Sequence, residues 1–275
     1  MATITISRGS YSKGKEVAQR VAERLGYRCI AREVVLDACK EFDIPEIQLR
    51  RALHDAPSIF EKFTQGKETF IAYFRAAFLS HLVADNVVYH GLAGHFFVER
   101  ALHVLKVRIL SDMEDRIRLE MERENVSQEE AQRVLTNDDE ERRKWSMDLY
   151  GIDTADPAPY DLVIHIKHGT TVEHAAGIIC EAAALPGFQR DAWSQKAIEN
   201  LALTAKVKAA LVRIKSDAEV SASNGFVRIN VKVPIEEEAE VVQELKTAAE
   251  SVPGVSRVDV KVAHRVKWSD GRLFP

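Results

Sequence analysis

Hydrophobic and polar residues follow clear periods at the start of the chain. Residues 3–7, TITIS, alternate Thr with Ile and are rich in β-branched side chains, which predicts a strand. After a short polar stretch, Val17, Val21 and Leu25 recur every four residues, so this segment is expected to form an amphipathic helix. The apolar residues of YRCI, at 27–30, predict a second strand. The chain therefore opens with a predicted β-α-β unit.

The same alternation of strands and helices continues to about residue 185. Apolar runs predict further strands at 86–91, 103–110 and 160–166. The segment 41–85 has mostly helical patterns, and 171–185 predicts a closing helix. This order is typical of an α/β fold with a parallel sheet flanked by helices. Ligands of such sheets bind at the carboxyl ends of the strands.

Two predicted capping boxes, Ser111 with Glu114 and Ser127 with Glu130, indicate a helical hairpin after the fourth strand. This hairpin is dense in charge, and most such residues on a helix simply face solvent. Phosphoryl transfer, however, needs several cations to neutralise the transferring group, and a closing lid is one way to supply them. The charged residues in question are Arg116, Arg118, Arg123, Arg133, Asp138, Asp139, Arg142 and Arg143.

The pattern changes after a segment that contains Pro and Gly. We expect a first domain at 1–186, a linker at 187–194 and a second domain at 195–275. In the second domain, FVRINVKV at 226–233 alternates strictly between apolar and polar residues, and Asn224-Gly225 before it predicts a hairpin turn. The elements predicted here are a helix at 195–213, strands at 218–223, 226–233 and 255–262, and a helix at 236–250. We therefore expect a small α+β domain of order α-β-β-α-β that folds independently of the first.

Composition narrows the class of protein. The 275 residues are 46% hydrophobic and 29% charged, with a formal net charge of −4, so no nucleic-acid partner is expected. The three cysteines form no CxxC pair and favour free thiols in the cytoplasm. No apolar run is long enough to span a bilayer, and no signal peptide is expected.

The loop between the first predicted strand and helix carries the clearest candidate chemistry. Residues 9–15, GSYSKGK, have the spacing of a Walker A phosphate loop, although Glu16 stands where Ser or Thr usually binds Mg²⁺. Backbone N–H groups at a helix N-terminus can hold phosphate oxygens, and Lys15 would reach the β- and γ-phosphates. Glu16 either complements the helix dipole or helps to hold Mg²⁺. The alternative is a glycine-containing turn that merely caps a helix. The candidate nucleotide-binding residues are Gly9, Ser10, Tyr11, Ser12, Lys13, Gly14, Lys15 and Glu16.

Residues 1 to about 185 resemble the cytidylate-kinase-like family of P-loop proteins, a branch of the nucleoside monophosphate kinases. The resemblance lies in ITISRGSYSKGKEVAQRVAERLGY, in RIRLEMERENVSQEEAQ and in DDEERRKWSMDLYGIDTADPAPYDLVIHI. It implies transfer of a phosphoryl group from ATP, with Mg²⁺, to a small acceptor such as CMP. It also implies that Lys15 holds the donor phosphates and that Arg116, Arg123 and Arg142 close over the transferring group, with Asp139 in the same lid region.

The chain departs from the family's pattern at three places: Ala31-Arg32, Gly91-Leu92 and His165-Ile166. The second of these stands where the family commonly has Gly-Arg. A nucleotide-binding regulator with a degenerate kinase site therefore remains an alternative, as does a pure interaction protein with a vestigial loop. His90 and His95 have no Cys or acidic partner at ligand spacing, so they predict structural histidines and no metal site.

The pattern of residues 195–262 resembles a BON domain, a small module of proteins that act at membranes or bind small ligands. The resemblance implies a ligand or partner for this domain but identifies neither. The tail at 264–275 mixes four basic residues with Trp268 and Phe274. It is either solvated or packed on a domain, or it binds phosphate or lipid.

Overall fold

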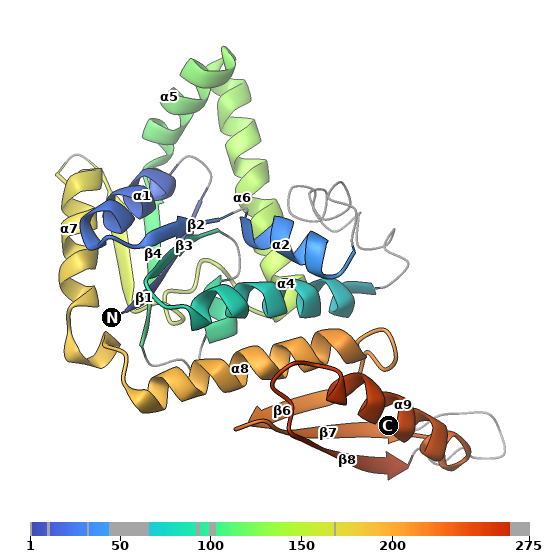
Figure 1. Cartoon of the computed structure of the whole chain (residues 1–275). Helices are drawn as coiled ribbons and strands as arrows, with labels where there is room; N and C mark the ends of the chain where they lie inside the picture. Colours follow the sequence, from blue (N-terminus) through green and yellow to red (C-terminus); the bar gives the residue numbers. More distant parts are fainter. Residues whose placement is uncertain are drawn as a thin grey trace. The chain divides into compact units, whose positions relative to one another are not determined.

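The structure is a computed structural model that describes residues 2–9, 12–31, 33–43, 66–91, 94–98, 103–167 and 169–264 (Figure 1). Contacts divide the chain into two units. The first comprises Met1–Lys62 and Ala84–Ser194, and the second comprises Phe63–Val83 and Gln195–Pro275. The second unit therefore includes a helix from the first half of the sequence, which the expected boundary at 186 did not anticipate.

A parallel sheet of five strands in the order β2-β3-β1-β4-β5 forms the centre of the first unit. This arrangement confirms the predicted α/β fold. The central strand β1 pairs with β3 on one side and with β4 on the other. The strands are β1 Thr3–Arg8, β2 Arg28–Ile30, β3 Val87–His90, β4 Val104–Ser111 and β5 Leu162–Ile166.

Two helices, α1 and α7, pack together and share one hydrophobic core with the sheet. A hairpin of two long helices, α5 and α6, follows β4 and projects beyond the carboxyl ends of the strands (Figure 1). It confirms the helical hairpin predicted from the sequence. The helices are α1 Gly14–Leu25, α2 Glu33–Glu41, η2 Gly94–Val98, α5 Met113–Glu124, α6 Gln128–Tyr150, α7 Val172–Ala183 and η3 Pro186–Phe188.

The two predicted capping boxes have different outcomes. Ser127 does cap α6, because its Oγ accepts a hydrogen bond from the amide of Glu130. The prediction for Ser111 was wrong. Ser111 is the last residue of β4, and Asp112 is the N-cap of α5 without a side-chain hydrogen bond. Periodicity could not separate these cases, since both have the same local sequence pattern.

The long helical segment expected at 41–85 is represented by α4, Gly66–Val83, which belongs to the second unit. Residues 44–65 lie outside the described residues. Helix α2 was not predicted, because Val34, Val35 and Leu36 form an apolar run without helical period.

In the second unit, a helix, a hairpin, a second helix and a last strand follow in sequence, which confirms the predicted α-β-β-α-β order. The hairpin turn has positive φ at Asn224 and Gly225, as predicted. Helix α8 begins at Ala192, so it starts inside the expected linker. The elements are α8 Ala192–Leu211, β6 Glu219–Ser223, β7 Phe226–Val233, η4 Ile235–Glu237, α9 Glu238–Glu250 and β8 Arg257–His264.

The small sheet has the order β6-β7-β8, with β7 antiparallel to β6 and parallel to β8. Its apolar face packs with α8 and α9 around Val207, Leu211, Ile229 and Leu245. All members of this core lie between residues 203 and 262. No described helix of the chain is long and apolar enough to cross a membrane.

Candidate functional site

The predicted phosphate loop connects the end of β1 to the start of α1. Ser12 Oγ donates a hydrogen bond to the carbonyl oxygen of Gly9 across 3.0 Å, which closes the loop on itself. Lys13 is the N-cap of α1 and has a left-handed backbone, with φ of 60°. Ser10 and Tyr11 lie outside the described residues. The described part of the loop therefore has the compact turn that a phosphate cradle requires.

Gly14 is required by the close approach of Arg8. A Cβ at position 14 would lie 2.6 Å from the Cβ of Arg8 and 2.8 Å from its Cδ, so any side chain would force the loop apart. Lys13 supplies no side-chain hydrogen bond to cap α1. The first amides of α1 thus lack the usual side-chain cap, and their partial positive charge favours an anion at this end.

The loop is also fixed to the end of β4. Ser111 Oγ donates a hydrogen bond to the carbonyl oxygen of Ser12 across 3.1 Å. The residue wrongly predicted to be a helix cap therefore positions the phosphate loop. This contact joins residues that are 99 positions apart, so no local pattern in the sequence could reveal it.

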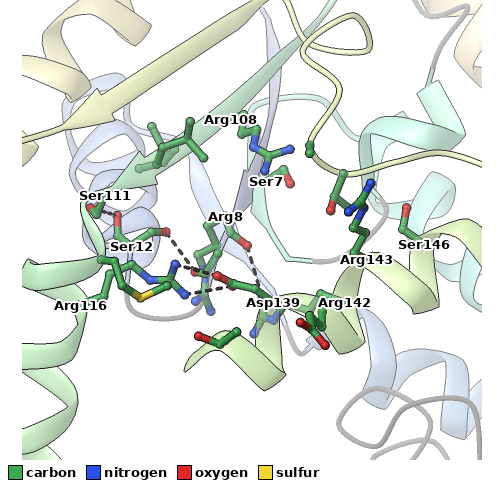
Figure 2. Close-up of a pocket in the computed structure, with 18 of the residues that line it drawn as sticks. Ser7, Arg8, Ser12, Arg108, Ser111, Arg116, Asp139, Arg142, Arg143 and Ser146 are labelled. Atoms are coloured by element: carbon green, nitrogen blue, oxygen red, sulfur yellow. Dashed lines mark hydrogen bonds and ion pairs between the residues drawn. The ribbon is translucent and has the colours of Figure 1, made fainter. Parts of the chain in front are cut away.

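Arg116 of α5 and Asp139 of α6 form a two-pronged ion pair beside the loop (Figure 2). The Arg116 side chain is buried, and a Cβ at Gly9 would lie 3.6 Å from Asp139 Oδ1 and 3.8 Å from the Arg116 guanidinium. The pair lines a cavity of about 330 Å³ that also contacts Arg8, Ser12 and Arg142. Residues of the lid hairpin and of the phosphate loop thus line the same cavity.

Arg142 of α6 lies against the strand end that precedes the loop. Its Nη1 donates a hydrogen bond to the carbonyl oxygen of Arg8 across 3.3 Å (Figure 2). Loss of water lowers the pKa of Arg142 from its ordinary value, and the positive charge of Arg8 adds to the effect. Two guanidinium groups therefore crowd the same small volume, where an anion would relieve their repulsion.

A second cavity, of about 760 Å³, is also lined by Arg142. Its lining includes Lys15, Glu16 and Arg123, together with the carboxylates of Glu122 and Asp138. Arg123 is exposed and pairs with Glu124 at 2.8 Å. All three predicted lid arginines thus line a cavity next to the loop: Arg116 the first, Arg123 the second and Arg142 both.

Sequence reasoning missed two arginines of the first cavity, Arg8 and Arg108, and it named Arg143 only among the charged residues of the hairpin. Arg8 directly precedes the loop, and its place at a strand's carboxyl end was an available signal. Arg108 lies within β4, where a cation in a parallel strand is itself unusual. Arg143 pairs with Asp153 at 2.6 Å. The signal for Arg143 was weak, since it resembles the other solvated arginines of α6.

The two histidines singled out from the sequence lie near this site. Burial, followed by the charges of Arg8 and Lys15, lowers the pKa of His90 to about 4. Burial, followed by the charges of Arg108 and Lys106, lowers the pKa of His95 to about 3. Both side chains are therefore neutral at physiological pH. Within the described residues, no group of three or more His, Cys, Asp or Glu side chains could hold a metal ion.

Of the other sequence departures, His165 lies at the end of β5 with its Nε2 2.9 Å from Asp112 Oδ1. It therefore joins β5 to the start of the lid helix α5. Gly91 is constrained by its neighbour, because a Cβ there would lie 2.5 Å from the Tyr89 hydroxyl. Arg32, Leu92 and the tail at 265–275 lie outside the described residues.

No curated protein matches the chain. Among solved structures, an uncharacterized protein from Eubacterium ventriosum is 19% identical with a TM-score of 0.51, covering 66% of this chain and 98% of that chain. Shikimate kinase from Acinetobacter baumannii, in complex with shikimate, is 15% identical with a TM-score of 0.39, covering 66% of this chain and 92% of that chain. Shikimate kinase from Bacteroides thetaiotaomicron is 11% identical with a TM-score of 0.42, covering 67% and 99% respectively. The first of these similarities, with its TM-score above 0.5, shows a shared fold.

The sequence similarity to a family is more extensive. The profile of the cytidylate kinase-like family matches residues 3–168, which run from β1 to the loop after β5 and include the phosphate loop and the lid hairpin. The chain therefore belongs to the cytidylate kinase-like family.

Proposed function

We propose that the first unit transfers a phosphoryl group from ATP, in the presence of Mg²⁺, to a small acceptor. The observation that carries this proposal is the position of Lys15 and Arg142 in one cavity, beside a glycine loop that opens a helix. Such a cavity combines a mobile ammonium group, a guanidinium fork and helix amides, which are complementary to a polyphosphate.

The residues present fit a nucleotide with its metal ion. The absence of a side chain at Gly14 lets the loop pack closely on Arg8, and the lack of a side-chain cap leaves the helix amides for phosphate oxygens. Glu16, Glu122 and Asp138 line the same cavity, and carboxylate oxygens are the ligand type that Mg²⁺ prefers. These described side chains do not form a metal-holding group by themselves, so a carboxylate would act together with the phosphate oxygens. Mg²⁺, when bound, would neutralise charge on the phosphates; Glu16 would act on it directly or through water, or serve only the helix dipole.

The lid arginines have different proposed roles. Arg142 would contact the transferring group, because it faces both cavities and hydrogen-bonds the strand end before the loop. Arg123 would contact the same group when the exposed end of the lid meets the nucleotide. Arg116 would position Asp139 and the loop, since its guanidinium already has a carboxylate partner. Cations of this kind stabilise the charge that spreads over the phosphoryl oxygens in the transition state.

Family membership favours a nucleoside monophosphate such as CMP as the acceptor. The test is a screen of CMP, dCMP, UMP and AMP with ATP and Mg²⁺, with diphosphate products measured by chromatography. We expect product with at least one acceptor and a loss of product in Lys15→Ala. Absence of product with every acceptor, while ATP still binds, would reject the kinase assignment and favour the alternative below.

The alternative is a nucleotide-binding regulator whose kinase site is degenerate. The departures that favour it are Leu92, where the family commonly has arginine after its third strand, and His165 in the last strand of the sheet. In that case ATP binds at Lys15 without turnover, and restoring the arginine with Leu92→Arg is the direct test. ATP binding without turnover in both the wild type and Leu92→Arg would favour the regulator.

The C-terminal domain and the cysteines support more general proposals. The α-β-β-α-β order of residues 195–262 supports a BON-like module that binds a ligand or partner, and it carries no proposed catalytic residue. None of the three cysteines, Cys29, Cys39 and Cys180, forms a disulfide, which supports a reducing compartment such as the cytoplasm.

A further inference from the structure

The two faces of the parallel sheet differ in polarity. Along β1 and β4, one face carries isoleucine, leucine and valine, which form the core with α1 and α7. The opposite face carries Thr3, Thr5 and Ser7 on β1 and Lys106 and Arg108 on β4. Strands of a parallel sheet are normally apolar on both faces. The polar face therefore calls for a physical explanation.

Arg108 is the exceptional member of this face. It is opposite Ser7 in the register of β1 and β4, and it lines the cavity of about 330 Å³ (Figure 2). Its guanidinium lies 5.5 Å from the centre of the Tyr160 ring. Its buried Nη1 has no hydrogen-bond partner among the described residues. Lys106, by comparison, has Asp161 at 3.7 Å.

His95 presents a second unsatisfied group to the same cavity. The residue is only 4% exposed, and its Nε2 has no hydrogen-bond partner within the described chain. Its ring packs on Tyr160 with 4.6 Å between ring centres, so Tyr160 lies against both His95 and Arg108. The Tyr160 hydroxyl in turn lies 3.3 Å from Ser7 Oγ. Ser7, His95, Arg108 and Tyr160 come from β1, η2, β4 and the segment before β5. Their contacts connect them into one group, which we call the floor of the cavity.

Leaving a buried donor unsatisfied is costly, more so for a charged group. Here an arginine nitrogen and a neutral imidazole nitrogen are both unsatisfied at one cavity wall. Two other cations of the cavity differ from Arg108, because Arg116 is paired with Asp139 and Arg143 with Asp153. The floor thus has the composition of an anion site: a guanidinium, an imidazole and a hydroxyl on a rigid sheet.

We propose that Arg108, His95 and Ser7 form a subsite for an anionic oxygen group, a phosphate or a carboxylate, of the small molecule that this chain uses as acceptor. Arg108 provides the charge, and His95 provides a neutral N–H donor whose tautomer the anion selects. The subsite lies on the sheet face beneath α6, so an acceptor held there lies under the lid hairpin. The assignment to the acceptor rests on the proposed phosphoryl transfer; the anion subsite itself does not.

The test follows the His95 ring signals of the full chain by NMR, identified with His95→Gln, during titrations with inorganic phosphate and with malonate. We expect saturable shifts with at least one of the two anions. The midpoint should rise at least tenfold in Arg108→Met and remain within twofold in Arg133→Met, an exposed arginine of α6 that pairs with Glu130. Arg108→Lys keeps the charge but loses the planar donor pair of the guanidinium, so its midpoint should lie between those of the wild type and Arg108→Met. If Arg108→Met does not fold, Arg108→Lys replaces it in the comparison.

Lys15→Ala separates this inference from the proposed function. It should weaken ATP binding but leave the His95 titration unchanged, whereas Arg108→Met should leave ATP affinity unchanged. A response to phosphate alone identifies a phosphomonoester acceptor, and a response to malonate alone identifies a carboxylate acceptor. The proposal is overturned if His95 responds to neither anion, or if the midpoints of Arg108→Met and Arg133→Met are equal. A wild-type chain that does not bind ATP but still shows the anion response would overturn the kinase assignment and leave the subsite standing.

Discussion

The Arg116 guanidinium donates two hydrogen bonds to the Asp139 carboxylate, with Nη1–Oδ2 at 2.7 Å and Nη2–Oδ1 at 2.9 Å. The pair joins α5 to α6 next to Gly9, the first residue of the phosphate loop. One ion pair therefore sets the geometry of the lid and of the loop together. A change in either partner is expected to affect both stability and nucleotide binding.

A double-mutant cycle with Arg116→Met and Asp139→Asn tests this relationship. Arg116 is buried, so removing only its partner leaves a charge without compensation, and each single variant should lose about 1–3 kcal/mol of stability. The double variant should lose less than the sum of the two, as interacting residues do. Urea unfolding followed by circular dichroism gives these values. Additive losses would show that the two side chains do not stabilise each other.

Gly14→Ala tests the packing of the loop. The new Cβ would lie 2.6 Å from the Arg8 Cβ, so the loop must shift, and ATP affinity should fall at least tenfold. Gly187→Ala is the matched control, since a Cβ there meets nothing within 4 Å. Fluorescence titration with a labelled ATP analogue measures both. Equal affinities of Gly14→Ala and the wild type would mean that the loop tolerates displacement and does not shape the site.

How far the sequence predicts this structure depends on the range of the contacts. The strand β1 and the helix α1 have clear local periods, and Gly26 ends α1 with φ of 68°. Arg116, Arg123 and Arg142 were predicted as lid arginines through the family resemblance, and Arg116 and Arg142 line the first cavity. Arg108 was not assigned to a site, because a polar residue in a strand often indicates a solvent-exposed face. His95, which lies in η2, was interpreted as structural because it has no Cys or acidic partner at ligand spacing. Only the packing of η2 and the segment around Tyr160 shows that this face is enclosed.

The buried histidines predict a specific pH dependence. The pKa values of His95 and His90 fall from 6.5 to about 3 and about 4, so the unfolded chain binds more protons between these values and 6.5. Stability should therefore be fully present above pH 6.5 and decrease as pH falls, by at most about 1.4 kcal/mol per pH unit for each histidine.

His95→Gln should reduce this slope, because glutamine does not titrate. His174→Gln, at an exposed position of α7, is the control and should leave the slope unchanged. Thermal melts between pH 4.5 and pH 7.5 provide the measurement. A slope in His95→Gln as steep as that of the wild type would indicate that His95 does not stay neutral in the folded chain.

The contacts of helix α4 predict which fragments of the chain fold on their own. Within the second unit, Val83 accepts a hydrogen bond from Gln195 across 3.3 Å, and Arg213 lies 5.6 Å from the Tyr73 ring. The α-β-β-α-β core contains no residue of α4. A fragment of residues 195–275 should therefore melt cooperatively, whereas a fragment of residues 1–186 should aggregate, because α4 loses these partners.

The sequence predicts two domains that fold independently, and on that prediction the fragment of residues 1–186 stays soluble. Light scattering and nucleotide titration of the 1–186 fragment distinguish the two expectations. A soluble fragment that binds ATP as the full chain does would show that α4 is stable without the second unit, and that the boundary at residue 186 is adequate.

The central claim is that a polyphosphate binds the loop Gly9–Glu16 through Lys15, and calorimetric titration with a non-hydrolysable ATP analogue and Mg²⁺ tests it most directly. The comparison is between the wild type, Lys15→Ala and Lys40→Ala, a lysine on the exposed side of α2. Loss of a charged hydrogen-bond partner should weaken binding of Lys15→Ala by about 1–3 kcal/mol, and Lys40→Ala should bind as the wild type does. Equal affinities of Lys15→Ala and the wild type would contradict the account.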